Sequence, residues 1–126
     1  MKKILTFIIL IALSMFCYSE QFIIQVPEDD YNQVQIHNMS SVKEFSGKLY
    51  KIEKQSDKEF IQKGILGTFI IKDIDDTCTF NKKTKKDTFI SVNLPAEFDG
   101  KFSYELEHKD FPMFDILVIH IIDKED

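Results

Sequence analysis

The stretch Phe114–Ile122, with the sequence FDILVIHII, constrains the fold more than any other part of the chain. If the stretch is extended, apolar side chains occupy both of its faces, which alternate as Phe114, Ile116, Val118, His120, Ile122 and as Leu117, Ile119, Ile121. This pattern is typical of a strand that is covered on both sides. Five of its nine residues are Ile or Val, which favours a strand over a buried helix. We therefore predict that it forms a central strand of a sheet.

The first nineteen residues have the features of a signal peptide. Two lysines precede the apolar segment Ile4–Phe16, and a small-x-small cleavage site, Cys17-Tyr18-Ser19, follows it. The apolar segment is shorter than the roughly 20 residues that span a bilayer, so we expect an exported protein, periplasmic or secreted, without a membrane span. The alternative is a lipoprotein anchored at Cys17, although the residues before this cysteine depart from the usual lipobox.

The remaining residues, 20–126, suit one small domain. Without the two leader lysines they contain 14 Lys against 21 Asp and Glu, a net charge of −7. Such an acidic surface argues against nucleic acid or anionic lipid as a partner. Cys78 is the only cysteine of this part. It can form no intramolecular disulfide, so the stability of the domain must come from its apolar core.

Short alternating segments, bounded by Pro, Gly and Asp, indicate strands near residues 22–26, 34–38, 48–53, 66–74, 77–80, 88–94, 102–107 and 114–122. A single short helix is predicted at Ser56–Gly64, because Ser56 and Glu59 match a capping box and Gly64 can end a helix. Seven or eight short strands at this spacing predict an all-β domain. We expect a small β-sandwich of immunoglobulin-like size, with a small β-barrel as the alternative.

No motif in the chain matches a catalytic or cofactor-binding signature, and we expect no cofactor. The three histidines lack the spacing of metal ligands. His120 lies in the apolar stretch, where a histidine that is hydrogen-bonded to a neighbour is a simpler interpretation than a catalytic base. Cys78 with His108 or His120 leaves a thiol enzyme as the third function hypothesis.

Two acidic turns supply candidate oxygen ligands for Ca²⁺, namely Asp29 and Asp30 in the first and Asp73, Asp75 and Asp76 in the second. Neither turn matches an EF-hand loop. The simpler interpretation is that these residues form turns on a solvated surface. A Ca²⁺-dependent ligand-binding sandwich is therefore the second function hypothesis.

An apolar loop, Phe111-Pro112-Met113-Phe114, leads into the predicted central strand. Phe111, Met113 and Phe114 are candidate anchors for a partner, because aromatic and Met side chains on a Pro-stiffened loop suit that role. The preferred interpretation is that they plug an open end of the sandwich. The leading function hypothesis is a non-enzymatic binding or structural module that recognises a protein or another envelope component.

Overall fold

Eight strands and one 3-10 turn make up the part of the chain that the structure, a computed structural model, describes: residues 20–112 and 114–125. The predicted signal peptide with Cys17, and Met113 of the apolar loop, lie outside these residues. The elements in chain order are β1 (Glu20–Gln25), β2 (Gln33–Asn38), β3 (Phe45–Lys54), β4 (Phe60–Ile71), β5 (Thr77–Phe80), β6 (Phe89–Leu94), η2 (Ala96–Phe98), β7 (Phe102–Phe111) and β8 (Phe114–Asp123).

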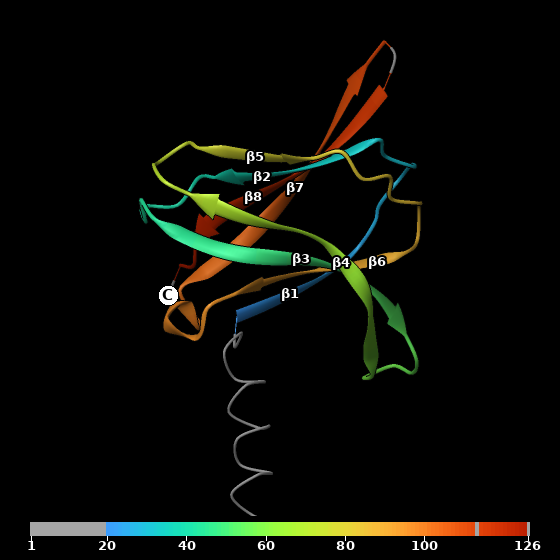
Figure 1. Cartoon of the computed structure of the whole chain (residues 1–126), viewed down its shortest axis with the longest axis horizontal. Helices are drawn as coiled ribbons and strands as arrows, with labels where there is room; N and C mark the ends of the chain where they lie inside the picture. The colour runs from blue at the N-terminus through green and yellow to red at the C-terminus, as the bar shows by residue number, and fades with distance from the viewer. Residues whose placement is uncertain (1–19, 113, 126) are drawn as a thin grey trace, which may run out of the picture.

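The strands form two sheets of four, with the orders β1-β6-β3-β4 and β5-β2-β8-β7. The sheets face each other as two layers (Figure 1). Between them lies one apolar core, to which the first sheet contributes side chains such as Leu49, Phe69 and Val92 and the second Ile36 and Leu117. The predicted all-β sandwich is confirmed, and the strands do not form the alternative single barrel.

The predicted central strand is also confirmed. It forms β8, which lies inside its sheet between β2, a parallel neighbour, and β7, an antiparallel one. Its core-facing side chains, Leu117, Ile119 and Ile121, are fully buried. Because backbone groups on both edges of β8 are paired, this strand connects β7 to the rest of the second sheet.

The outer face of β8 is covered differently from what the sequence predicts. Val118 is buried, but it lies outside the core cluster. The register places Gln35 of β2 and Glu107 of β7 on either side of it. Long polar side chains can cover an apolar neighbour with their stems while their polar ends stay in water. Cover on this face therefore comes from adjacent strands.

The predicted helix at Ser56–Gly64 is wrong. Phe60 begins β4, and β3 and β4 form one long antiparallel hairpin. The hairpin is closed by residues 55–59, where the Gln55 amide donates a 2.7 Å hydrogen bond to the Glu59 carbonyl. A two-turn helix has little stability of its own, so the pairing of ten residues along β3 prevails over the local capping signal.

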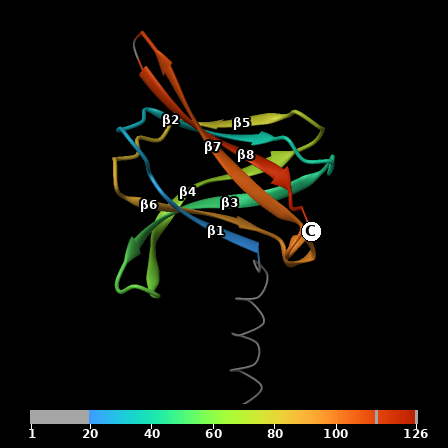
Figure 2. The ribbon, with the colours of Figure 1, turned by 180° about the vertical axis from the view of Figure 1, so that it is seen from behind.

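The β7–β8 hairpin projects beyond both layers, and it does so in two opposite views (Figures 1 and 2). Phe111 and Phe114 are cross-strand partners at its end. Among residues 20–112 and 114–125, no helix is long and apolar enough to cross a membrane.

Candidate functional site

The end of the β7–β8 hairpin presents two aromatic rings to solvent. The Phe111 and Phe114 rings are stacked, with centroids 5.4 Å apart and planes at 27°. The two residues are 43% and 39% exposed. For Phe111 and Phe114 the preferred interpretation of a plug is therefore wrong, because both rings are exposed and neither belongs to the apolar core.

Acidic groups surround the base of this hairpin end. Asp110 and Asp115 are cross-strand partners, and they are adjacent to the Phe111–Phe114 pair. Like charges in such positions repel each other. The loop between β1 and β2 adds Glu28, whose carboxylate lies 3.4 Å from a ring nitrogen of His108. Lys109 is the lysine of β7. The apolar end thus rises from a base with several carboxylates, and the lysine-containing loop 82–86 pairs with the loop that carries Glu28.

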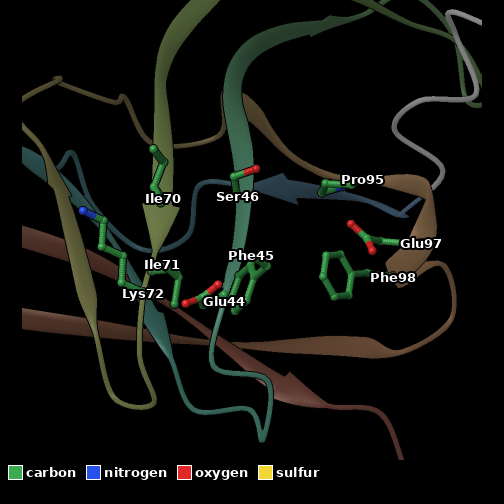
Figure 3. A pocket seen from close by; sticks show the side chains of 9 residues that line it. All are labelled: Glu44, Phe45, Ser46, Ile70, Ile71, Lys72, Pro95, Glu97 and Phe98. Carbon is green, nitrogen blue, oxygen red and sulfur yellow. The ribbon is translucent and has the colours of Figure 1, made fainter.

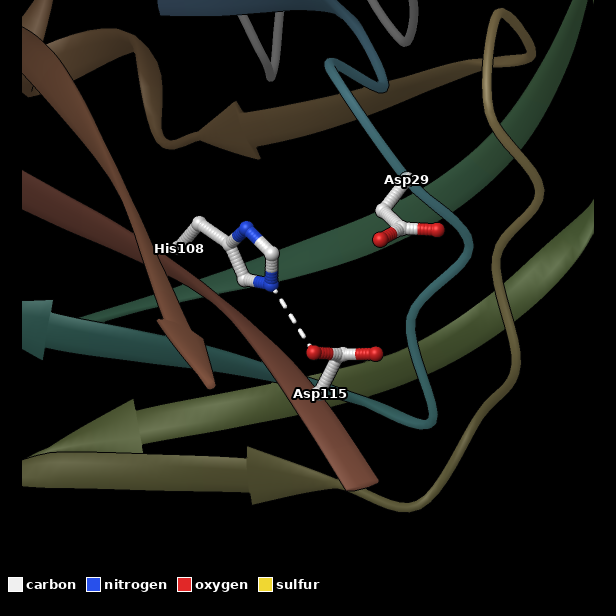
Figure 4. Close-up of side chains that lie close together, drawn as sticks. All are labelled: Asp29, His108 and Asp115. Atoms are coloured by element: carbon white, nitrogen blue, oxygen red, sulfur yellow. Dashed lines mark hydrogen bonds and ion pairs between the residues drawn. The ribbon is translucent and has the colours of Figure 1, made fainter. Parts of the chain in front are cut away.

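Asp29, His108 and Asp115 converge below the hairpin end (Figure 4). One possible ligand atom from each residue lies within 4.8 Å of the other two. The His108 Nε2 lies 2.9 Å from an Asp115 carboxylate oxygen, as the dashed line in the figure marks. One imidazole and two carboxylates suit a borderline transition metal better than Ca²⁺, which prefers an all-oxygen shell.

The histidine and tyrosine of this region have perturbed acidities. The hydrogen bond to Asp115 raises the pKa of His108; partial burial opposes this shift, and the Glu28 carboxylate adds to it. Burial raises the pKa of Tyr31, with a further contribution from Glu28 and the neighbouring aspartates. The Tyr31 hydroxyl donates to the Pro27 carbonyl at 2.9 Å, and the Tyr31 ring contacts the His108 ring edge-on. His108 is therefore held as a partner of carboxylates.

The acidic turns mostly use their carboxylates to hold the backbone. The Asp30 carboxylate accepts from the Lys86 amide, that of Asp73 from Ile74, and that of Asp76 from Lys72 and Thr77. Asp75 lies at a positive φ of 69° and contacts His37 instead. Of the five calcium candidates, only Asp29 lies in a group of three potential ligands within the described residues.

His37 and His120 meet on the outer face of the second sheet. They are register partners in the parallel β2–β8 pair, and their Nδ1 atoms lie 2.8 Å apart. The His37 Nε2 lies 2.5 Å from an Asp75 oxygen, and the His120 Nε2 lies 2.7 Å from a Glu107 oxygen. The expectation that His120 is hydrogen-bonded to neighbours is confirmed. The hydrogen bond between His120 and Glu107 lowers the pKa of the Glu107 carboxyl.

Cys78 packs against the core from the inner face of β5. Its thiol donates to the Ile70 carbonyl at 3.4 Å. His120 uses its two ring nitrogens for His37 and Glu107, and His108 uses its own for Asp115 and Glu28. In the part of the chain described, the pairing of Cys78 with His108 or His120 that a thiol enzyme would need is therefore not formed.

A hollow of about 460 Å³ lies where η2 meets the ends of β3 and β4 (Figure 3). Phe45, Ile71 and Phe98 supply apolar walls, and Glu44 and Glu97 stand at the rim. The Phe45 and Phe98 rings pack against each other with centroids 6.0 Å apart. This hollow combines core side chains with separate surface charges and shows no convergent polar groups.

Comparisons with protein-family models, with curated proteins and with solved structures find no match. The site residues are therefore assigned by geometry alone. Sequence reasoning identified Phe111 and Phe114 but missed Asp115 and the pairing of His37 with His120. Each of these histidines directly follows an isoleucine of its strand, but only the parallel β2–β8 register brings them together.

Proposed function

We propose that this protein is an exported, non-enzymatic binding module that recognises a protein partner in the cell envelope through the end of its β7–β8 hairpin. The observation that carries the proposal is the exposed, stacked pair Phe111 and Phe114. Two large aromatic side chains held in water at a projecting end gain little for the fold. They become favourable when a partner buries them.

The hairpin prepares these rings for binding. Each ring sits at the end of a ten-residue strand, and the two strands are paired along their whole length. The rings also contact each other, which limits their rotamers before a partner arrives. A preorganised aromatic anchor loses less conformational entropy on binding than a flexible one. Aromatic side chains are correspondingly common among interface hot spots.

The charges at the hairpin base define the chemistry of the partner. Asp110, Asp115, Glu28 and Asp29 gather there, next to Lys109. The lysine-containing loop 82–86 pairs with the far side of the Glu28 loop, through Tyr31 and Asp30. We expect the partner to offer an apolar pocket surrounded by Lys or Arg. Complementary charge chiefly speeds association, and salt screens it over about 8 Å at physiological ionic strength. Capture should therefore slow as salt is added.

The test is the double variant Phe111→Ala with Phe114→Ala, compared with Ile65→Ala. Ile65 is 53% exposed on β4 of the other sheet, so this control removes surface apolar area elsewhere. Partners are captured from a native envelope extract by the unmodified protein, identified and titrated. We expect the double variant to lose more than 30-fold in affinity, equivalent to about 2 kcal/mol, and the control to bind normally.

The melting temperature of the double variant should fall by only a few degrees, because an aromatic pair of this kind contributes about 1 kcal/mol. Unchanged capture after both rings are removed would contradict the proposal. The export part has its own test, since the intact mass of the exported protein should match a chain that begins at Glu20. An acylated Cys17 would instead make the protein a lipoprotein.

A further inference from the structure

The outer face of the second sheet carries a chain of four side chains from four separate elements. Asp75 comes from the turn between β4 and β5, His37 from β2, His120 from β8 and Glu107 from β7. Successive members lie 2.5, 2.8 and 2.7 Å apart. The side chains of His37 and His120 are only 20% and 13% exposed. The two imidazoles are therefore partly enclosed and held from both ends.

The hydrogen bonds of this chain leave two lone pairs facing each other. Both Nε2 atoms lie against carboxylate oxygens, and an ionised carboxylate only accepts hydrogen bonds. Each Nε2 therefore carries a hydrogen. A neutral imidazole has one N–H, so both Nδ1 atoms present lone pairs across a gap of 2.8 Å. The two Nδ1 atoms can share one hydrogen in a hydrogen bond, or both can offer their lone pairs to a metal ion that takes its place.

We propose that His37 and His120 bind a divalent transition-metal ion of the Zn²⁺ class through their Nδ1 atoms. Imidazole nitrogens suit Zn²⁺, Cu²⁺ and Ni²⁺, whereas Ca²⁺ and Mg²⁺ prefer oxygen. Two nitrogens bound to a tetrahedral Zn²⁺ at about 2.0 Å are about 3.3 Å apart. The observed pair needs to open by about 0.5 Å to reach this separation.

The carboxylates occupy the positions that metal-bound histidines normally give to their supporting partners. A histidine ligand usually donates its second ring N–H to a carboxylate, which fixes its tautomer and orientation. Asp75 does this for His37, and Glu107 does it for His120. Both histidines also stand on the paired inner strands of the sheet. The two ligand atoms are thus oriented before an ion arrives.

The surroundings leave room for the rest of a coordination shell. A hollow of about 440 Å³ opens over the two imidazoles, with Val118 and Glu105 in its lining. Glu105 is the register partner of His120 on β7 and is exposed. Glu105 does not form a group of three ligand atoms within 4.8 Å with the two histidines among the described residues, so water would supply the remaining ligands. Two histidines with open positions describe a site for an exchangeable ion.

The group of Asp29, His108 and Asp115 is the rival site, but its one imidazole is already hydrogen-bonded to a carboxylate of the group. The His108 Nε2 donates to Asp115, so an imidazole and a carboxylate face each other there. The Asp29 carboxylate lies within 4.8 Å of both and accepts a hydrogen bond from the Asp30 amide. The His37–His120 pair lacks this internal balance and therefore makes the stronger claim on a cation. The inference is independent of the hairpin end and of the proposed partner.

The test starts from the purified exported protein, which is first treated with a chelator to remove bound metal. It is then titrated with ZnCl₂ in a calorimeter. Variants His37→Gln and His120→Gln are compared with the control His108→Gln, and circular dichroism establishes that each is folded. We expect one Zn²⁺ per chain, a loss of at least 100-fold in each of the first two variants, and unchanged binding in the control. Asp75→Asn and Glu107→Gln should each weaken binding about 10-fold to 100-fold.

A second measurement needs no variant. Long-range ¹H–¹⁵N spectra of the unmodified protein should show the Nδ1 resonances of His37 and His120 shifting as Zn²⁺ is added, while their Nε2 atoms stay protonated. The absence of Zn²⁺ binding would overturn the proposal and leave a shared proton as the bridging cation. Binding that is lost in His108→Gln but kept in His37→Gln would overturn it in favour of the rival site.

Discussion

Two neighbouring residues of β8 provide a sharp test of how the sandwich is built. Ile119 and Val118 are equally buried, at 0% and 1% exposure, but they point to opposite faces of the sheet. Ile119 belongs to the core cluster, whereas Val118 lies between Gln35 and Glu107 on the outer face. Replacing each of them with Thr gives the same product side chain in adjacent positions of one strand, so the difference in stability reports the environment once the larger side chain of Ile119 is allowed for.

The expected losses follow from these surroundings. Ile119→Thr replaces a methylene and a methyl group by a hydroxyl. This loses about 1.5 kcal/mol of burial, and a hydroxyl among apolar side chains costs about 1–3 kcal/mol more. Val118→Thr keeps the shape of the side chain, and its hydroxyl has the Gln35 amide and the Glu107 carboxylate as neighbours. We expect a loss of about 1 kcal/mol or less.

Thermal unfolding followed by circular dichroism separates the two variants. A domain of about 100 residues loses about 4 °C for each kcal/mol, so Ile119→Thr should melt roughly 15 °C lower and Val118→Thr within about 4 °C of the unmodified protein. Equally large losses would refute the assignment, since they would mean that another layer, such as a second copy, buries the outer face. Equally small losses would mean that Ile119 of β8 does not lie in the apolar core.

Three further predictions concern packing, pH and calcium. A Cβ added at Gly67 would lie 2.4 Å from the Phe80 ring, so Gly67→Ala should destabilise the protein by about 1–3 kcal/mol in thermal melts, whereas Gly64→Ala, with nothing within 4 Å, should not. His108 has a raised pKa through Asp115, so its contribution to stability should be complete below about pH 6.5 and disappear as pH rises through the raised value; urea titrations across this range should show a decline that His108→Gln removes. Millimolar Ca²⁺ should leave the melting temperature unchanged, because the carboxylates of the second acidic turn hold backbone amides; a rise that Asp76→Asn abolishes would contradict this.

The amino-acid sequence by itself determined which segments are strands. Alternation of apolar and polar residues is a local property, and it located Thr77–Phe80 to the residue and the others to within a few residues, apart from β4. It also identified the stretch Phe114–Ile122 as a central strand, because few other arrangements bury an apolar run of this length. Local signals failed at Ser56–Gly64, where the capping box had to compete with the long pairing of β3.

Tertiary structure alone decided which residues meet. His37 and His120 are 83 positions apart, and their contact depends on the parallel pairing of β2 with β8. Periodicity shows which face of a strand a side chain occupies but not which strand lies beside it. The exposure of Phe111 and Phe114 likewise depends on how far their hairpin extends beyond the layers. Local pattern therefore specifies strands and faces, and long-range strand pairing creates the candidate sites from them.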